Sequence, residues 1–135
     1  MIVNHINIAV SDVAVSRDFY TKYFGLTVMM ERGENFLAIL RDDAGMVFNI
    51  SHFDKAAEVS YPRDFHIGFF LENREQVEAV RAQMLADGLE VAEPRRAQGR
   101  WTFYFQVPGG VLTEVGCLEG AGWQPGADEA PQPQG

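Results

Sequence analysis

The chain has 135 residues, 47% apolar and 22% charged, which is the composition of a globular protein long enough for one hydrophobic core. Eleven basic and nineteen acidic residues give a net charge of −8, which argues against nucleic acid as a partner, because phosphate binding needs clustered Lys and Arg. The single cysteine, Cys117, has no internal disulfide partner, and no apolar run approaches the roughly 20 residues of a membrane span. The N-terminus lacks a signal-peptide pattern, so we expect a cytoplasmic protein without a membrane association.

Two segments of the chain begin in the same way. Residues 5–12 read HINIAVSD and residues 66–73 read HIGFFLEN, so that each starts with His-Ile, continues as an apolar run and ends in a helix-capping residue type. Apolar residues at helical spacing follow each segment and end at Gly25 and Gly88, which predicts two helices. The candidate N-caps are Ser11 or Asp12 for the first helix and Asn73 for the second.

Three strand-like runs follow each predicted helix. They are 27–31, 35–41 and 46–52 in the first half, and 89–93, 100–107 and 111–117 in the second. The sequence therefore predicts an α+β fold of two β-α-β-β-β modules, about 1–53 and 62–118, within one domain, 1–118. We expect the modules to form a curved, partly open mixed sheet around a central pocket, with helices outside. Residues 119–135, rich in Pro and Gly, are expected to form a loose C-terminal tail.

Alternation along the predicted strands separates an apolar face from a polar one. A plain solvated face would favour Lys, Glu, Thr and Arg, whereas this polar face carries histidine, tyrosine and amide side chains with scattered apolar residues, as a pocket lining does. Its members are His5, Asn7, Asn49, His66, Tyr104 and Glu114.

His5 and His66 hold equivalent positions in the two modules, and Glu114 lies on a strand that can neighbour His66. Two imidazoles and one carboxylate on a single face form the facial pattern that holds a divalent metal with positions left open. The alternative is a pocket in which the same three side chains act only as hydrogen-bond partners.

These features resemble the vicinal oxygen chelate superfamily, which includes glyoxalase I, fosfomycin-resistance proteins, bleomycin-resistance proteins and extradiol dioxygenases. The resemblance covers about residues 2–117 and rests on HINIAVSD followed by SRDFYTKYFGL, on HIGFFLEN, and on FYFQVPGGVLTEVG. It implies a homodimer. It fixes the fold more firmly than the reaction, because one fold serves many chemistries.

The resemblance also implies which residues hold the metal. Family ligands lie on the first and last strand of each module, where this chain has His5, Asn49, His66 and Glu114. Asn49 stands where glyoxalase I carries a carboxylate, which counts against that activity. Fosfomycin-resistance enzymes and extradiol dioxygenases use two His and one Glu, so we expect Fe, Mn, Zn, Ni or Co on His5, His66 and Glu114.

Further roles follow from the same resemblance. Tyr104 matches a tyrosine that can donate a hydrogen bond to a metal-bound oxyanion, and His52 is the remaining histidine for acid–base work. The residues expected to contact substrate are Asn7, Asn49, Val47, Phe70, Leu112 and Arg100.

Two functions of different classes remain open from the sequence. The first is a small metalloenzyme that chelates a substrate through adjacent oxygens and acts as a lyase, isomerase, transferase or ring-cleaving dioxygenase. The second is a metal-free protein of the bleomycin-resistance type that binds an antibiotic or another small molecule, for which the acidic surface would attract a cationic drug.

Overall fold

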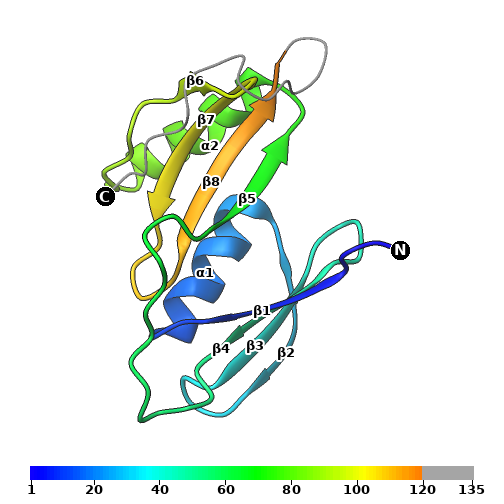
Figure 1. Ribbon diagram of the computed structural model, residues 1–135, viewed down its shortest axis with the longest axis vertical. Helices are drawn as coiled ribbons and strands as arrows, with labels where there is room; N and C mark the ends of the chain where they lie inside the picture. The colour runs from blue at the N-terminus through cyan, green and yellow to red at the C-terminus, as the bar shows by residue number, and fades with distance from the viewer. Residues whose placement is uncertain (120–135) are drawn as a thin grey trace. The chain divides into compact units, whose positions relative to one another are not determined.

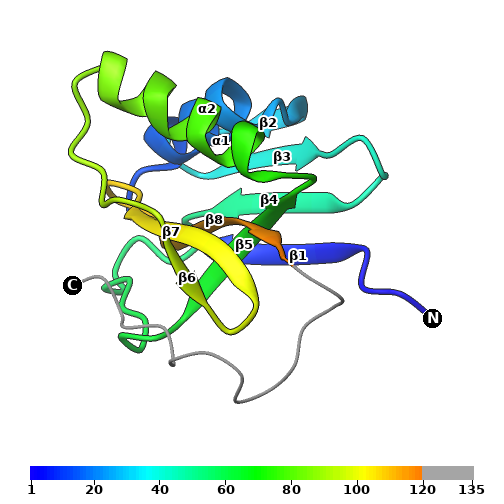
Figure 2. The ribbon, with the colours of Figure 1, turned by 90° about the horizontal axis from the view of Figure 1, so that it is seen from above.

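The computed structural model describes residues 1–119, which form two compact units. The first unit holds residues 1–61 and the turn 107–111, and the second holds residues 62–106 and 112–119. Each unit has a four-stranded mixed sheet with one helix on one of its faces (Figures 1 and 2). The predicted α+β class is confirmed. The predicted tail lies outside the described residues, except for its first residue, Glu119.

The first unit contains a sheet of strand order β1-β4-β3-β2, in which β1 runs parallel to β4 and the other pairs are antiparallel. Its elements are β1 (His5–Ala9), α1 (Val13–Phe24), β2 (Thr27–Arg32), β3 (Leu37–Arg41) and β4 (Val47–Ser51). Asp12 caps α1 by accepting a hydrogen bond from the Val15 amide, and Gly25 ends the helix in the left-handed conformation at φ +67°. Tyr20 of α1 packs edge-to-face on Phe48 of β4, and both side chains are buried.

The second unit repeats this topology with the order β5-β8-β7-β6. Its elements are β5 (His66–Leu71), α2 (Arg74–Ala86), β6 (Arg95–Ala97), β7 (Arg100–Gln106) and β8 (Leu112–Leu118). The predicted N-cap, Asn73, accepts a hydrogen bond from the Gln76 amide. Val77 and Met84 of α2 and Phe103 and Val115 of the sheet are buried in the core of this unit.

The predicted strand 89–93 is wrong, because the first strand after α2 is the short β6. The guanidinium of Arg81 donates from Nε to the Ala92 carbonyl at 3.0 Å and from Nη2 to the Val91 carbonyl at 3.4 Å. Pro94 has no amide proton to give to a ladder. A helix side chain therefore satisfies backbone groups that a neighbouring strand would otherwise pair.

The register of the parallel pair is the same in both units and places the polar side chains. His5 lies opposite Val47 and Asn7 opposite Asn49 in the first unit. In the second unit, His66 lies opposite Leu112, and Gly68 lies opposite Glu114. These residues occupy the sheet face away from the helix, as the alternation predicts. Within residues 1–119, every helix is too short or too polar to cross a bilayer.

Candidate functional site

A buried carboxylate lies in the middle of the sheet of the second unit. Glu114 on β8 is only 3% exposed. Its Oε2 atom accepts hydrogen bonds from Arg100 Nε at 3.0 Å and from Thr102 Oγ1 at 2.7 Å, and its Oε1 atom lies 3.5 Å from His66 Nε2. Burying a carboxylate is costly unless it is paired, and Arg100 and Thr102 provide the pairing.

The local sequence explains why these side chains meet. Arg100, Thr102 and Tyr104 are spaced by two along β7, so all three lie on the face of the sheet that carries Glu114. On the other side of β8, Gly68 lies opposite Glu114, and a Cβ atom there would approach Oε1 to 3.5 Å. The glycine therefore leaves room beside Oε1, and His66 enters from the same strand, two residues earlier.

A hydrogen bond to the backbone orients the ring of His66. Nδ1 lies 2.9 Å from the Asp64 carbonyl oxygen, which can only accept, so Nδ1 carries the proton. Nε2 is the ring nitrogen that faces Oε1 of Glu114. It can donate to this oxygen when it carries a proton, and without one it can share a cation with it. This tautomer, held by a backbone carbonyl, is the usual arrangement for a metal-binding histidine. His66 and Glu114 therefore fit a divalent cation.

The third predicted ligand, His5, is exposed on β1 of the first unit. Among residues 1–119, no three His, Cys, Asp or Glu side chains come together as a metal site. The geometry thus supplies two of the predicted ligands side by side, and the three-residue set stays a prediction.

Tyr104 lies directly beside His66 and Glu114. Its ring meets the His66 ring edge-to-face, with centroids 5.3 Å apart. Burial raises the pKa of Tyr104, and the Glu114 carboxylate raises it further, against a lowering by Arg100. The hydroxyl therefore stays protonated at neutral pH and can donate a hydrogen bond.

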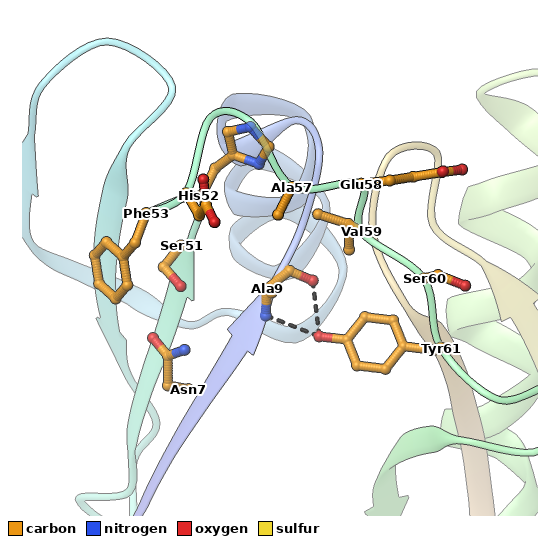
Figure 3. A pocket seen from close by; sticks show the side chains of 11 residues that line it. Asn7, Ala9, Ser51, His52, Phe53, Ala57, Glu58, Val59, Ser60 and Tyr61 are labelled. Atoms are coloured by element: carbon orange, nitrogen blue, oxygen red, sulfur yellow. Dashed lines mark hydrogen bonds between the residues drawn. The ribbon is translucent and has the colours of Figure 1, made fainter.

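A pocket of about 360 Å³ lies in the first unit, where the segment 52–61 passes the ends of β1 and β4 (Figure 3). Tyr61 holds this segment to β1, because its hydroxyl donates to the Ala9 carbonyl and accepts from the Ala9 amide, both at 2.8 Å. His52 Nδ1 donates to the Val10 carbonyl at 2.8 Å, which leaves Nε2 of the neutral ring with a lone pair.

The pocket brings together two of the predicted residues, Asn7 and His52. Sequence reasoning missed Tyr61, because it lies in a linker with no hydrophobic period. It also missed Thr102, although the spacing of two from Tyr104 was a usable signal.

The remaining predicted contact residues lie on several strands. Val47 and Asn49 occupy the same face of β4, and Asn49 Oδ1 is buried without a hydrogen-bond partner. Phe70 on β5 is exposed, Leu112 on β8 is buried, and Arg100 is bound to Glu114.

Comparison with known proteins identifies the family. Residues 2–115 match the model of the Glyoxalase/Bleomycin resistance protein/Dioxygenase superfamily, and the chain belongs to that superfamily. A comparison with curated proteins gave no match.

Three solved structures illustrate the likeness. A possible glyoxalase from Bacillus cereus is 39% identical, with a TM-score of 0.78 over 87% of this chain and 99% of that one. The fosfomycin resistance protein FosX from Listeria monocytogenes is 25% identical, with a TM-score of 0.65 over 87% of this chain and 94% of its own. Lactoylglutathione lyase from Agrobacterium tumefaciens, at 16% identity and a TM-score of 0.70 over 86% and 92% of the two chains, shares the fold.

Proposed function

We propose that this protein is a metal-dependent enzyme that binds a small substrate through two adjacent oxygen atoms. The divalent metal is Fe, Mn, Zn, Ni or Co, and its ligands are His5, His66 and Glu114. The observation that carries the proposal is the approach of His66 Nε2 to Oε1 of the buried Glu114, at 3.5 Å. We further propose a cytoplasmic homodimer.

The residues around the proposed metal have distinct roles in this proposal. A divalent metal held by these residues would supply Lewis-acid chemistry to a chelated hydroxyl. Tyr104 would donate a hydrogen bond to an oxygen of the substrate, because its own hydroxyl stays protonated. Asn7 and Asn49 orient the substrate, Val47, Phe70 and Leu112 contact its apolar part, and His52 moves a proton.

The class of reaction follows from which side chains are proposed as metal ligands. Asn49 replaces the carboxylate expected in glyoxalase I, and an amide is a weak ligand and no base. We therefore place the reaction among lyase, isomerase, transferase or ring-cleaving dioxygenase chemistries that need two imidazoles and one carboxylate. The 25% identity to a fosfomycin resistance protein makes fosfomycin the first substrate to test, followed by diols and hydroxyketones.

Metal content of the purified, untagged protein tests the proposal. Elemental mass spectrometry should find about one divalent metal per chain in the wild type, and His66→Ala and Glu114→Gln should lose it. Glu90→Gln, an exposed acid outside the cluster, is the matched control and should keep the metal. A wild type that holds none of the five metals after reconstitution contradicts the proposal.

The pocket of the first unit favours a second candidate, a metal-free protein that binds a cationic small molecule. Its lining includes Asp54 and Glu58 and contains no Lys or Arg. Lys55, from the same segment, points its Nζ to the backbone carbonyls of Glu34 and Asn35. Calorimetric binding of a cationic antibiotic such as bleomycin, in the presence of a chelator, would support this candidate. A requirement for added metal would contradict it.

A further inference from the structure

The carboxylate of the proposed metal site already carries a cation. The Arg100 side chain is only 11% exposed, its Nε donates to Glu114 Oε2 at 3.0 Å, and its Nη1 donates to Gln98 Oε1 at 3.3 Å. A guanidinium stays charged at every pH at which the protein is folded. The negative charge of Glu114 is therefore balanced before any metal arrives.

The two oxygens of Glu114 have different partners. Oε2 accepts hydrogen bonds from Arg100 and Thr102 of β7, whereas Oε1 faces His66 Nε2 at 3.5 Å. Tyr104, the third polar side chain on this face of β7, also interacts with the carboxylate. Thr102 Oγ1 also lies 3.1 Å from the Val115 carbonyl, but its contact with Glu114 is shorter, at 2.7 Å. Arg100 and Thr102 hold the carboxylate at Oε2, and this contact fixes the direction in which Oε1 is presented.

We propose that Arg100 sets the charge of the metal site and that Thr102 sets its geometry. Both are positioning residues that act through Glu114, and this inference rests on the proposed metal-dependent function. Because Arg100 balances the charge of Glu114, the proposed ligands would add no net negative charge to the site. With a divalent cation bound, the site would carry a net charge of about +2.

Two consequences follow from this charge balance. The site binds a divalent cation less tightly than an unpaired carboxylate would, because the guanidinium repels the metal across a partly buried site. In return, the bound cation attracts anionic ligands more strongly. The substrate class that fits is a chelator that presents two anionic oxygens, and a neutral diol is a poorer fit.

Calorimetric titration with Mn²⁺ alone tests the first consequence. Arg100→Gln keeps a hydrogen-bond donor and removes the charge, and its Mn²⁺ affinity should rise about tenfold. Arg100→Lys keeps the charge and should stay within about twofold of the wild type. Thr102→Val should lose about tenfold in affinity, as is typical when the partner of a metal ligand is removed, whereas Thr102→Ser should not.

Oxalate, a doubly anionic chelator, tests the second consequence on the Mn²⁺-loaded proteins. Arg100→Gln should bind oxalate about tenfold more weakly than the wild type although it binds Mn²⁺ more tightly. Opposite signs for the two ligands are the signature of a charge effect, since a merely structural defect would weaken both. An Arg100→Gln protein that binds Mn²⁺ no more tightly than the wild type overturns the inference.

Folding is checked separately by circular dichroism. If metal-free Arg100→Gln is unfolded at 25 °C, Arg100→Met and Arg100→Lys are compared in the same titration at lower temperature, and equal Mn²⁺ affinities would overturn the inference. Failure of the proposed function looks different: the wild type itself would bind no Mn²⁺. Mn²⁺ binding by the wild type without the predicted change in Arg100→Gln refutes only the role of Arg100.

Discussion

The two units share a topology and a register but differ at the equivalent position of the last strand. Asn49 on β4 lies opposite Asn7, and Glu114 on β8 lies opposite Gly68. Glu114 Oε2 accepts two hydrogen bonds, whereas Asn49 Oδ1 is buried with none.

The neighbouring strands account for this difference. Ile39 lies opposite Asn49, where Tyr104 lies opposite Glu114, and Leu37 occupies the position on β3 that Thr102 occupies on β7. An apolar pair thus borders the amide and a polar pair borders the carboxylate. A repeat preserves the backbone, but the chemistry of a position depends on which side chains the next strand brings to it.

Removing the carboxylate should have the largest effect on stability. Glu114→Leu leaves the buried guanidinium of Arg100 without its counter-charge, and we expect a loss of about 3–5 kcal/mol in the free energy of unfolding. The double variant Glu114→Leu/Arg100→Met should lose much less, because no buried charge remains unpaired. Urea denaturation measures both, and simple additivity of the two single variants would argue against a coupled pair.

The converse test introduces a carboxylate into the first unit, at Asn49, the position equivalent to Glu114. Asn49→Glu should cost about 1–3 kcal/mol, because Leu37 and Ile39 offer a carboxylate no donor. Asn49→Leu should be neutral or stabilising, since it removes a buried oxygen that has no partner. A destabilised Asn49→Leu would show that the amide makes a contact worth keeping. Thermal unfolding of the three proteins decides between these outcomes.

The pocket of the first unit can be loosened without touching the second. Tyr61→Phe removes both hydrogen bonds to Ala9 and should lower stability by about 1 kcal/mol. Limited proteolysis should then cut the segment 52–61 faster than in the wild type, while segments of the second unit keep their protection. Equal cleavage rates would mean that the tyrosine does not hold the segment.

The smallest effect concerns an ion pair on the surface of the second unit. Hydrogen bonding from Arg74 lowers the pKa of Glu119 below its ordinary value. The ion pair therefore contributes its full stabilisation at any pH above the ordinary pKa of a glutamate. This stabilisation is lost as the pH falls through the lowered pKa that Glu119 has in the folded protein. Glu119→Gln should be slightly less stable than the wild type at pH 7 and indistinguishable in strong acid. A constant difference over that range would contradict the assignment.

Much of the fold could be predicted from local patterns. The repeat of HINIAVSD and HIGFFLEN, the cap at Asp12 and the left-handed Gly25 all rest on residues that are close in sequence. Strand alternation likewise placed His66, Tyr104 and Glu114 on one face, because successive side chains of a strand must point to opposite sides. These features need only the geometry of the backbone.

Other features were decided by contacts between distant parts of the chain. The carbonyls of Val91 and Ala92 are taken by Arg81, which removes a strand that the pattern predicted. Tyr61 binds a residue 52 positions earlier, with no periodic signal to reveal it. Such pairings depend on how loops and helices pack, and that packing is a property of the whole core.

The sequence by itself determined the repeated fold and the face on which the polar side chains gather. Only the tertiary structure decided that Arg100, 14 residues from Glu114, neutralises that carboxylate and that Thr102 fixes its direction. The physical reason is that a burial-driven fold brings a carboxylate inside only with its partners, and their identity depends on strand register.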